Sequence, residues 1–177
     1  MQMTTFKAKC VIIGDSAVGK TSLISCFVDH KFPSDYLPTI GTNLYIKELV
    51  EDDIQIILTL WDIAGEKKWT LMRKLYYKGA TGAFLVGDLT RPDTLTNLKE
   101  YWLKDLQKNC EDIPIVLLMN KNDLEKNIND DMVNEIAESI KAIAVYYTSA
   151  KTGTNVDQAF NTLIKKMLSN ALKKQNI

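Results

Sequence analysis

The sequence predicts an α/β fold with a mostly parallel sheet covered by helices on both faces. Short apolar runs recur along the chain, segments of helical periodicity fill most of the gaps between them, and the composition (46% hydrophobic, 25% charged) is that of a globular domain. The runs that resemble buried strands are Cys10 to Ile13, Ile54 to Trp61, Ala83 to Val86, Ile115 to Met119 and Ile143 to Tyr147. Strands that alternate with helices are typical of a parallel sheet with helices on both sides.

One segment departs from this alternation. Between Gly41 and Trp61, two extended stretches flank the polar residues 51–53, and no room is left for a crossover helix. A hairpin fits this segment and gives one antiparallel strand at the sheet edge. Residues 156–168 place apolar side chains at i, i+3, i+4 and i+7, which predicts a helix that covers the sheet.

Length and charge limit the possible functions. With 177 residues and neither repeats nor a linker-like segment, we expect residues 1–177 to form a single domain. Lys and Arg together number 22, as do Asp and Glu, so no overall field favours nucleic acid or anionic lipid as the partner. The sequence has neither a signal peptide, a membrane-spanning run, nor a terminal cysteine for prenylation. We therefore expect a cytoplasmic protein, peripheral on membranes only through partners or a longer tail.

A phosphate-binding motif follows the first predicted strand. GDSAVGKT, Gly14 to Thr21, matches G-x-x-x-x-G-K-[ST] between a β-branched run and a helical segment. Its glycines let successive N–H groups turn inward around an anion, Lys20 would reach the phosphates and Thr21 would ligate Mg²⁺. We expect nucleotide contacts from Asp15, Ser16, Ala17, Val18, Gly19, Lys20, Thr21 and Ser22. The motif alone leaves ATPases, kinases and GTPases possible, beside an accidental glycine loop.

Two further motifs follow strands and indicate a guanine pocket. NKND, Asn120 to Asp123, comes after IVLLM, and TSAKTG, Thr148 to Gly153, comes after the last predicted strand. The Asp123 carboxylate would accept two hydrogen bonds from guanine N1–H and its exocyclic amine, which adenine does not offer on that edge. The Ala150 N–H would meet guanine O6. The expected base-binding residues are Asn120, Lys121, Asp123, Ser149, Ala150 and Lys151.

The motifs GDSAVGKT, PTIG, WDIAG, NKND and TSAK together resemble the Ras superfamily of small GTPases over nearly the whole chain. WDIAG, YYKGATG and TSAKTGTNVDQAF are most similar to the Rab branch. The resemblance implies a P-loop fold with six strands, one of them an antiparallel edge strand, and five helices. It also implies a molecular switch that binds GTP or GDP with Mg²⁺ and is controlled by an exchange factor, a GTPase-activating protein and effectors.

The resemblance assigns further roles by position. Phe32 would lie against the guanine face and Tyr36 would cover the phosphates, although aromatic packing is an alternative for both. The Gly65 N–H would contact the γ phosphate. The implied metal ligands are Thr21, Thr39 and Asp62, the last through water, and the implied effector surface is Leu44, Trp61 and Tyr76.

Glu66 is the main departure from the family, which has glutamine after the DxxG glycine to orient the attacking water. An ionised carboxylate only accepts hydrogen bonds, and at ~4 Å from a phosphate charge it is disfavoured by about 4 kcal/mol at an effective dielectric of 20. We therefore expect Glu66 to swing out, to bind a proton or to act with a rearranged water. The implied catalytic set is Lys20, Thr39, Gly65 and Glu66.

The chain has two arginines, Arg73 and Arg91. Neither aligns with the position of an internal arginine finger. We expect Arg73 to be solvated on the surface, near the second of the two switch loops that the resemblance implies. Slow GTP hydrolysis without a partner is therefore the leading hypothesis. The alternative is a GTP-binding interaction module that barely hydrolyses. An ATP-dependent P-loop enzyme does not explain NKND together with TSAK.

Overall fold

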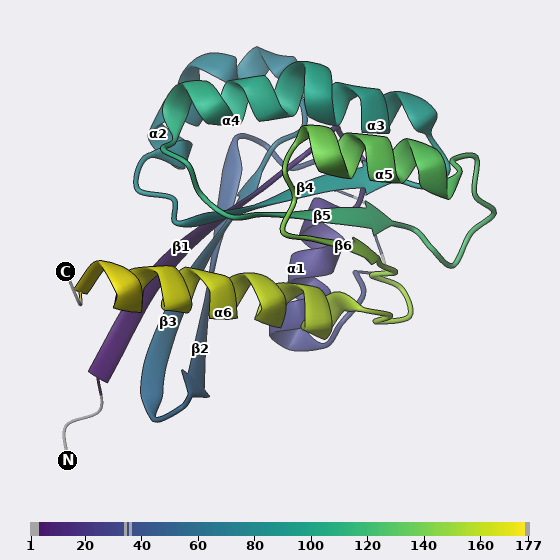
Figure 1. The fold of residues 1–177 in the computed structure, drawn as a ribbon. Coiled ribbons are helices and arrows are strands. Elements are labelled where there is room, and N and C mark those ends of the chain that lie inside the picture. The colour runs from purple at the N-terminus through teal and green to yellow at the C-terminus, as the bar shows by residue number, and fades with distance from the viewer. Residues whose placement is uncertain (1–3, 34, 36, 176–177) are drawn as a thin grey trace.

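The computed structural model describes residues 4–33, 35 and 37–175 (Figure 1). The strands are β1 (Thr4–Ile13), β2 (Thr42–Glu51), β3 (Ile54–Ile63), β4 (Gly82–Asp88), β5 (Ile115–Asn120) and β6 (Ala144–Tyr147). The helical elements are α1 (Lys20–Asp29), the 3-10 turn η1 (Lys67–Trp69), α2 (Thr70–Tyr77), α3 (Pro92–Asn97), the π-helical η2 (Leu98–Leu103), α4 (Lys104–Asn109), α5 (Asp130–Ser139) and α6 (Val156–Gln175).

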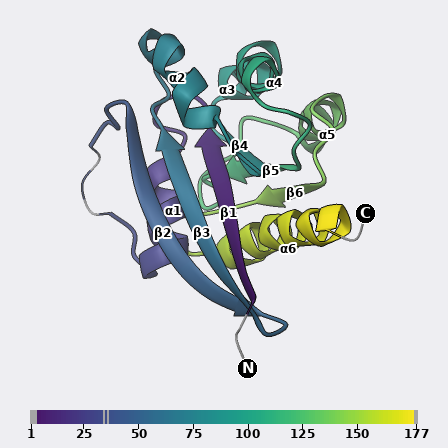
Figure 2. The ribbon, with the colours of Figure 1, turned by 90° about the vertical axis from the view of Figure 1, so that its left-hand side faces the viewer.

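The fold prediction is confirmed. The strands form one sheet in the order β2-β3-β1-β4-β5-β6, and only the pair β2 and β3 is antiparallel. Because α3, η2 and α4 continue into one another, the described residues form five helices besides the turn η1. Helices α1 and α6 cover one face of the sheet, and α2, α3 to α4 and α5 cover the other (Figures 1 and 2).

The predicted hairpin joins β2 and β3. Glu51 pairs with Ile54, so only Asp52 and Asp53 form the loop. Both residues have positive φ angles, 47° and 62°, as a two-residue hairpin turn of the primed type requires. The hairpin makes β2 the antiparallel edge strand. The other five strands are parallel, so their carboxyl ends meet at one edge of the sheet.

Two hydrophobic layers hold the sheet between the helices. On the α1 and α6 side, the Phe160 ring stacks on Phe27 with ring centroids 4.3 Å apart and lies 4.4 Å from Phe84. Trp102 is fully buried on the opposite side. In the described part of the chain, no helix combines the length and the hydropathy that crossing a bilayer requires.

The expected surface position of Arg73 is wrong. Its side chain is fully buried, because the helical phase of α2 turns residues 73 and 77 toward α4. An Arg73 guanidinium nitrogen donates to Asp105 Oδ2 at 2.9 Å, and the Tyr77 hydroxyl donates to the same oxygen at 2.9 Å. The guanidinium also lies 4.7 Å from the Trp102 ring centroid. Arg73 thus ties α2 to η2 and α4.

We expect Asp105→Asn to lower the free energy of unfolding by about 3 kcal/mol, because removal of one partner leaves the Arg73 charge buried and uncompensated. Urea unfolding followed by circular dichroism measures this loss. Glu100→Gln is the matched control, since Glu100 pairs with Lys104 on the surface, where both side chains are more than half exposed. Solvent screens that pair, so its loss should change stability little. Equal losses in the two variants would contradict the assigned role of Asp105.

Candidate functional site

A cavity of about 580 Å³ opens at the carboxyl edge of the sheet, where the loops after β1, β3, β5 and β6 meet. This is the edge at which open α/β sheets bind ligands. The structure brings most of the predicted residues together here. Those that line the cavity are Ser16, Ala17, Gly19, Lys20, Thr21, Ser22, Phe32, Thr39, Gly65, Glu66, Asn120, Lys121, Asp123, Ala150 and Lys151.

Close backbone approach explains the two glycines of the phosphate loop. A Cβ atom on Gly14 would lie 2.3 Å from the Val86 carbonyl oxygen, and one on Gly19 would lie 2.2 Å from Asn120 Nδ2. Gly19 also has a φ angle of 101°, in the region that side chains disfavour. The phosphate loop therefore lies directly against β4 and against Asn120, the first residue of NKND. We call residues 120–123 the base-side loop.

Lys20 is a buried cation with neutral partners. Its ammonium donates to the carbonyl oxygens of Gly14 at 2.9 Å and of Asp15 at 2.8 Å. Burial lowers the pKa of Lys20 to about 8, and the more distant carboxylates of Asp62 and Asp15 only partly oppose this effect. An anion bound in the cavity would raise the pKa of Lys20 back toward its ordinary value.

The Asp15 carboxylate points away from the cavity. It accepts hydrogen bonds from Asn97 Nδ2 at 2.6 Å and from Trp102 Nε1 at 2.7 Å. These partners lie in α3 and η2, so the side chain fastens the phosphate loop to that helix. Trp102 is 87 residues away in the sequence, and no local pattern indicated this contact.

Three oxygen-bearing side chains converge beside the phosphate loop. Thr21 Oγ1 donates to Asp62 Oδ2 at 2.5 Å and lies 3.0 Å from Thr39 Oγ1. The Asp62 carboxylate is fully buried, its Oδ1 has no hydrogen-bond partner, and burial raises its pKa against the hydrogen bonds from Thr21 and Thr39. Two hydroxyls and a carboxylate with one unsatisfied oxygen fit a small, hard cation such as Mg²⁺, with phosphate and water as its other ligands.

The loop after β3 touches the phosphate loop. A Cβ atom on Gly65 would lie 2.3 Å from the Ser16 nitrogen and 2.4 Å from the Asp15 carbonyl carbon. Only glycine permits this approach. The next side chain, Glu66, lines the cavity, but its carboxylate pairs with Lys68 at 2.5 Å.

Asn120 locks three segments around the base side of the cavity. Its Nδ2 donates to the Val18 carbonyl oxygen at 2.9 Å, while its Oδ1 accepts from Thr148 Oγ1 at 3.2 Å and from the Ala150 N–H at 3.3 Å. The Ala150 N–H predicted to meet guanine O6 therefore already points toward Asn120. The Val18 side chain is buried in the core, so only its backbone belongs to the site.

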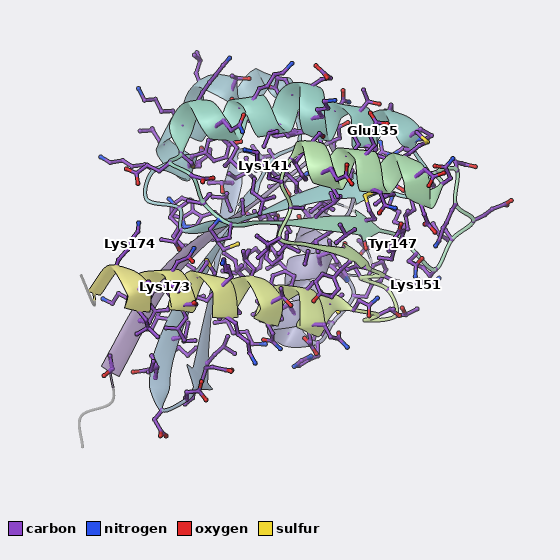
Figure 3. The ribbon with its side chains drawn as sticks, viewed as in Figure 1. Glu135, Lys141, Tyr147, Lys151, Lys173 and Lys174 are labelled. Atoms are coloured by element: carbon purple, nitrogen blue, oxygen red, sulfur yellow. The ribbon has the colours of Figure 1, made fainter. Side chains whose placement is uncertain are left out.

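Asp123 and Lys151 lie where the base-side walls open to solvent. Asp123 Oδ1 accepts a hydrogen bond of 2.7 Å from the buried Ser149 hydroxyl, which fixes the orientation of the carboxylate without placing Ser149 on the cavity wall. Figure 3 shows Lys151 on the loop between β6 and α6. Phe32 stands at the mouth and is 51% exposed, while Tyr36 lies outside the described residues.

Sequence reasoning missed Asp88 and Arg91. The buried Asp88 carboxylate accepts from Lys121 Nζ at 2.6 Å and from Arg91 Nε at 3.0 Å, and an Arg91 Nη2 donates to the Ser16 carbonyl oxygen at 2.8 Å. Burial alone would raise the pKa of Asp88, but the hydrogen bonds from Lys121 and Thr90 hold it below its ordinary value. One signal was present: a charged residue ends the apolar run GAFLVGD, beside the strand that carries NKND.

The profile of the Ras family matches residues 9–169 of the chain. The chain is 39% identical over 170 residues to Ras-related protein Rab-2B of Dictyostelium discoideum, which covers 92% of this chain and 83% of the relative. It is 34% identical over 165 residues to Ras-related protein Rab7 of Drosophila melanogaster, covering 90% and 80%. These matches extend over the sheet and all the loops that form the cavity. The chain belongs to the Ras family and is a Rab-like, GTP-binding small GTPase.

Proposed function

We propose that the cavity binds GTP and GDP with Mg²⁺ and that the chain hydrolyses GTP slowly unless a partner assists. The observation that carries this proposal is the convergence of the Thr21, Thr39 and Asp62 oxygens beside the buried ammonium of Lys20. Phosphate would compensate the charge of the Lys20 ammonium, and a divalent cation would bind the oxygens of Thr21, Thr39 and Asp62. Phosphate and the cation also neutralise each other. The cavity volume of about 580 Å³ suits a ligand of this size.

Thr21, Thr39 and Asp62 would hold the cation, the first two directly and Asp62 through water. When bound, Mg²⁺ neutralises charge that develops on the phosphoryl oxygens. The protein supplies position: the loop N–H groups and Lys20 cradle the phosphates, and the base-side loop orients the guanine. Asp123 would select guanine, since its carboxylate matches two adjacent donors on the base.

Thr39 and Gly65 would sense the γ phosphate. Thr39 lies on the loop before β2, and Gly65 lies on the loop after β3, where it already contacts the phosphate loop. A γ phosphate would hold both loops in place, and its loss would release them. This is a two-state element biased by one chemical group.

The implied effector surface forms one continuous patch. Leu44 pairs with Trp61 across β2 and β3, the Trp61 ring centroid lies 6.3 Å from that of Tyr76, and Leu44 is 52% exposed. All three residues lie close to the loops that carry Thr39 and Gly65. A partner that reads this patch would sense the nucleotide state. We infer that effectors bind here and that an exchange factor and a GTPase-activating protein control the two states.

We expect guanine nucleotide to copurify with the protein. Asp123→Asn replaces two acceptor bonds, so GDP affinity should fall about 100-fold, while xanthosine diphosphate, which offers a carbonyl in place of the amine, should gain affinity. Competition against a fluorescent GDP analogue measures both affinities. Asp131→Asn on the exposed side of α5 is the control and should bind like wild type. Adenine nucleotide in the extract, or unchanged base preference in Asp123→Asn, would overturn the guanine assignment.

Glu66→Gln should hydrolyse GTP at least about tenfold faster than wild type, because the amide donates to transition-state oxygens and removes a charge that repels them. Single-turnover hydrolysis without partner proteins measures the rate. Glu135→Gln, on α5 (Figure 3), is the matched control and should leave the rate unchanged. Equal and rapid turnover by wild type and Glu66→Gln would sink the idea of slow intrinsic hydrolysis.

Chelation of Mg²⁺ should speed GDP release from the wild-type protein. Asp62→Asn should release GDP about tenfold faster even with Mg²⁺ present, because residues that hold a metal through water typically contribute that much to its affinity. EDTA should then increase the rate of GDP release from this variant only slightly. Stopped-flow release of fluorescent GDP measures each rate. A wild-type protein indifferent to EDTA would show that the three converging side chains do not hold a metal.

A further inference from the structure

Asp88 is a buried carboxylate that accepts hydrogen bonds from three neighbouring residues. It ends β4 opposite Asn120 of β5 and has no exposed surface. Oδ1 accepts from the Thr90 N–H at 2.9 Å and the Thr90 hydroxyl at 2.7 Å, while Oδ2 accepts from Lys121 Nζ at 2.6 Å and Arg91 Nε at 3.0 Å. A buried charge persists only where such partners compensate it. Asp88 therefore fixes two cations that start from different loops.

Arg91 links Asp88 to the phosphate loop. While its Nε donates to Asp88, an Nη2 donates to the Ser16 carbonyl oxygen at 2.8 Å. The guanidinium is planar and rigid, so the two bonds set the distance between the end of β4 and the Ser16 peptide. Gly65 approaches the preceding peptide of the same loop, the one between Asp15 and Ser16. A shift of Arg91 would thus move loop N–H groups that are aimed at the phosphates.

Lys121 links Asp88 to the base-side loop. Its ammonium pairs with Asp88, its backbone adopts a φ angle of 67°, and its side chain lines the cavity. The loops after β4 and β5 are also joined by their backbones, since the Leu89 N–H donates to the Asn120 carbonyl oxygen at 3.0 Å. The fixed ammonium holds the aliphatic part of Lys121 along the wall where a base would stack.

We propose that Arg91 is a positioning residue for the phosphate loop, and that the Asp88 carboxylate couples it to Lys121 so that one buried charge aligns both ends of the nucleotide. The inference rests on the proposed nucleotide site and deepens it. It assigns Arg91 a role behind the loop, since its side chain is absent from the cavity wall. A purely structural ion pair would change stability without changing the bound nucleotide, and this difference separates the two roles.

The decisive variant is Arg91→Lys. Lysine keeps the charge that faces Asp88 but does not span both Asp88 and the Ser16 carbonyl oxygen. Its melting temperature should stay within about 4 °C of wild type, whereas GDP release should be about tenfold faster. The phosphorus-31 NMR resonance of the GDP β-phosphate should move, while the proton resonance of guanine N1–H should not. Lys104→Gln, an exposed cation on α4, is the control and should leave all four readings unchanged.

Asp88→Asn weakens the hold on Arg91 and Lys121 together. It should therefore move both the β-phosphate and the guanine N1–H resonances, and Arg91→Lys should add little to its effect on GDP release. The inference is wrong if Arg91→Lys releases GDP at the wild-type rate and leaves the β-phosphate resonance unmoved. It is also wrong if Asp88→Asn moves only one of the two resonances. A wild-type protein that binds no GDP would instead refute the proposed function.

Discussion

Compensation of buried charge at the carboxyl edge of the sheet is the constraint on which the site depends. Lys20, Asp62 and Asp88 each lose nearly all contact with solvent there. Asp88 has two cations beside it and Asp62 has two hydroxyls, but the hydrogen-bond partners of Lys20 are neutral carbonyl oxygens. The site thus holds an ammonium whose hydrogen-bond partners are neutral and a carboxylate with one unsatisfied oxygen. A phosphate with its cation would complete both.

The same contacts tie the loops to one another. The phosphate loop is held by Trp102 through Asp15, by Arg91 through Ser16 and by Asn120 through the carbonyl oxygen of Val18. These partners lie on three different segments of the chain. A ligand that binds to the loop thus meets a preorganised set of N–H groups, and little conformational entropy remains to be lost.

Local motifs placed much of this site from the sequence alone. GDSAVGKT and NKND each come where a strand ends, and parallel strands bring their ends together, so the meeting of these two motifs followed from their positions. Thr39, Gly65 and Glu66 were placed by the resemblance to the family. Arg73 shows what spacing does not reveal: α2 alone offers no reason to bury a cation, and Asp105 is supplied by a helix 32 residues away. Asp88, Arg91 and Trp102 were missed for the same reason. Their roles depend on which segments pack together, a property of the tertiary fold and not of periodicity.

Two electrostatic interactions of unequal size determine the orientation of the Glu66 carboxylate. Its pair with Lys68 is exposed, with side chains 39% and 63% accessible, and such pairs contribute at most about 1 kcal/mol. Repulsion from a phosphate charge at ~4 Å is about 4 kcal/mol at an effective dielectric of 20, before Mg²⁺ and Lys20 reduce it. A bound phosphate would therefore disfavour an inward-facing carboxylate more strongly than the pair with Lys68 favours the outward one. With Glu66 in that position, neither it nor Arg91 behind the loop is placed to order the attacking water. If the chain hydrolyses GTP as proposed, the missing donor would come from a second protein that approaches the open side of the cavity.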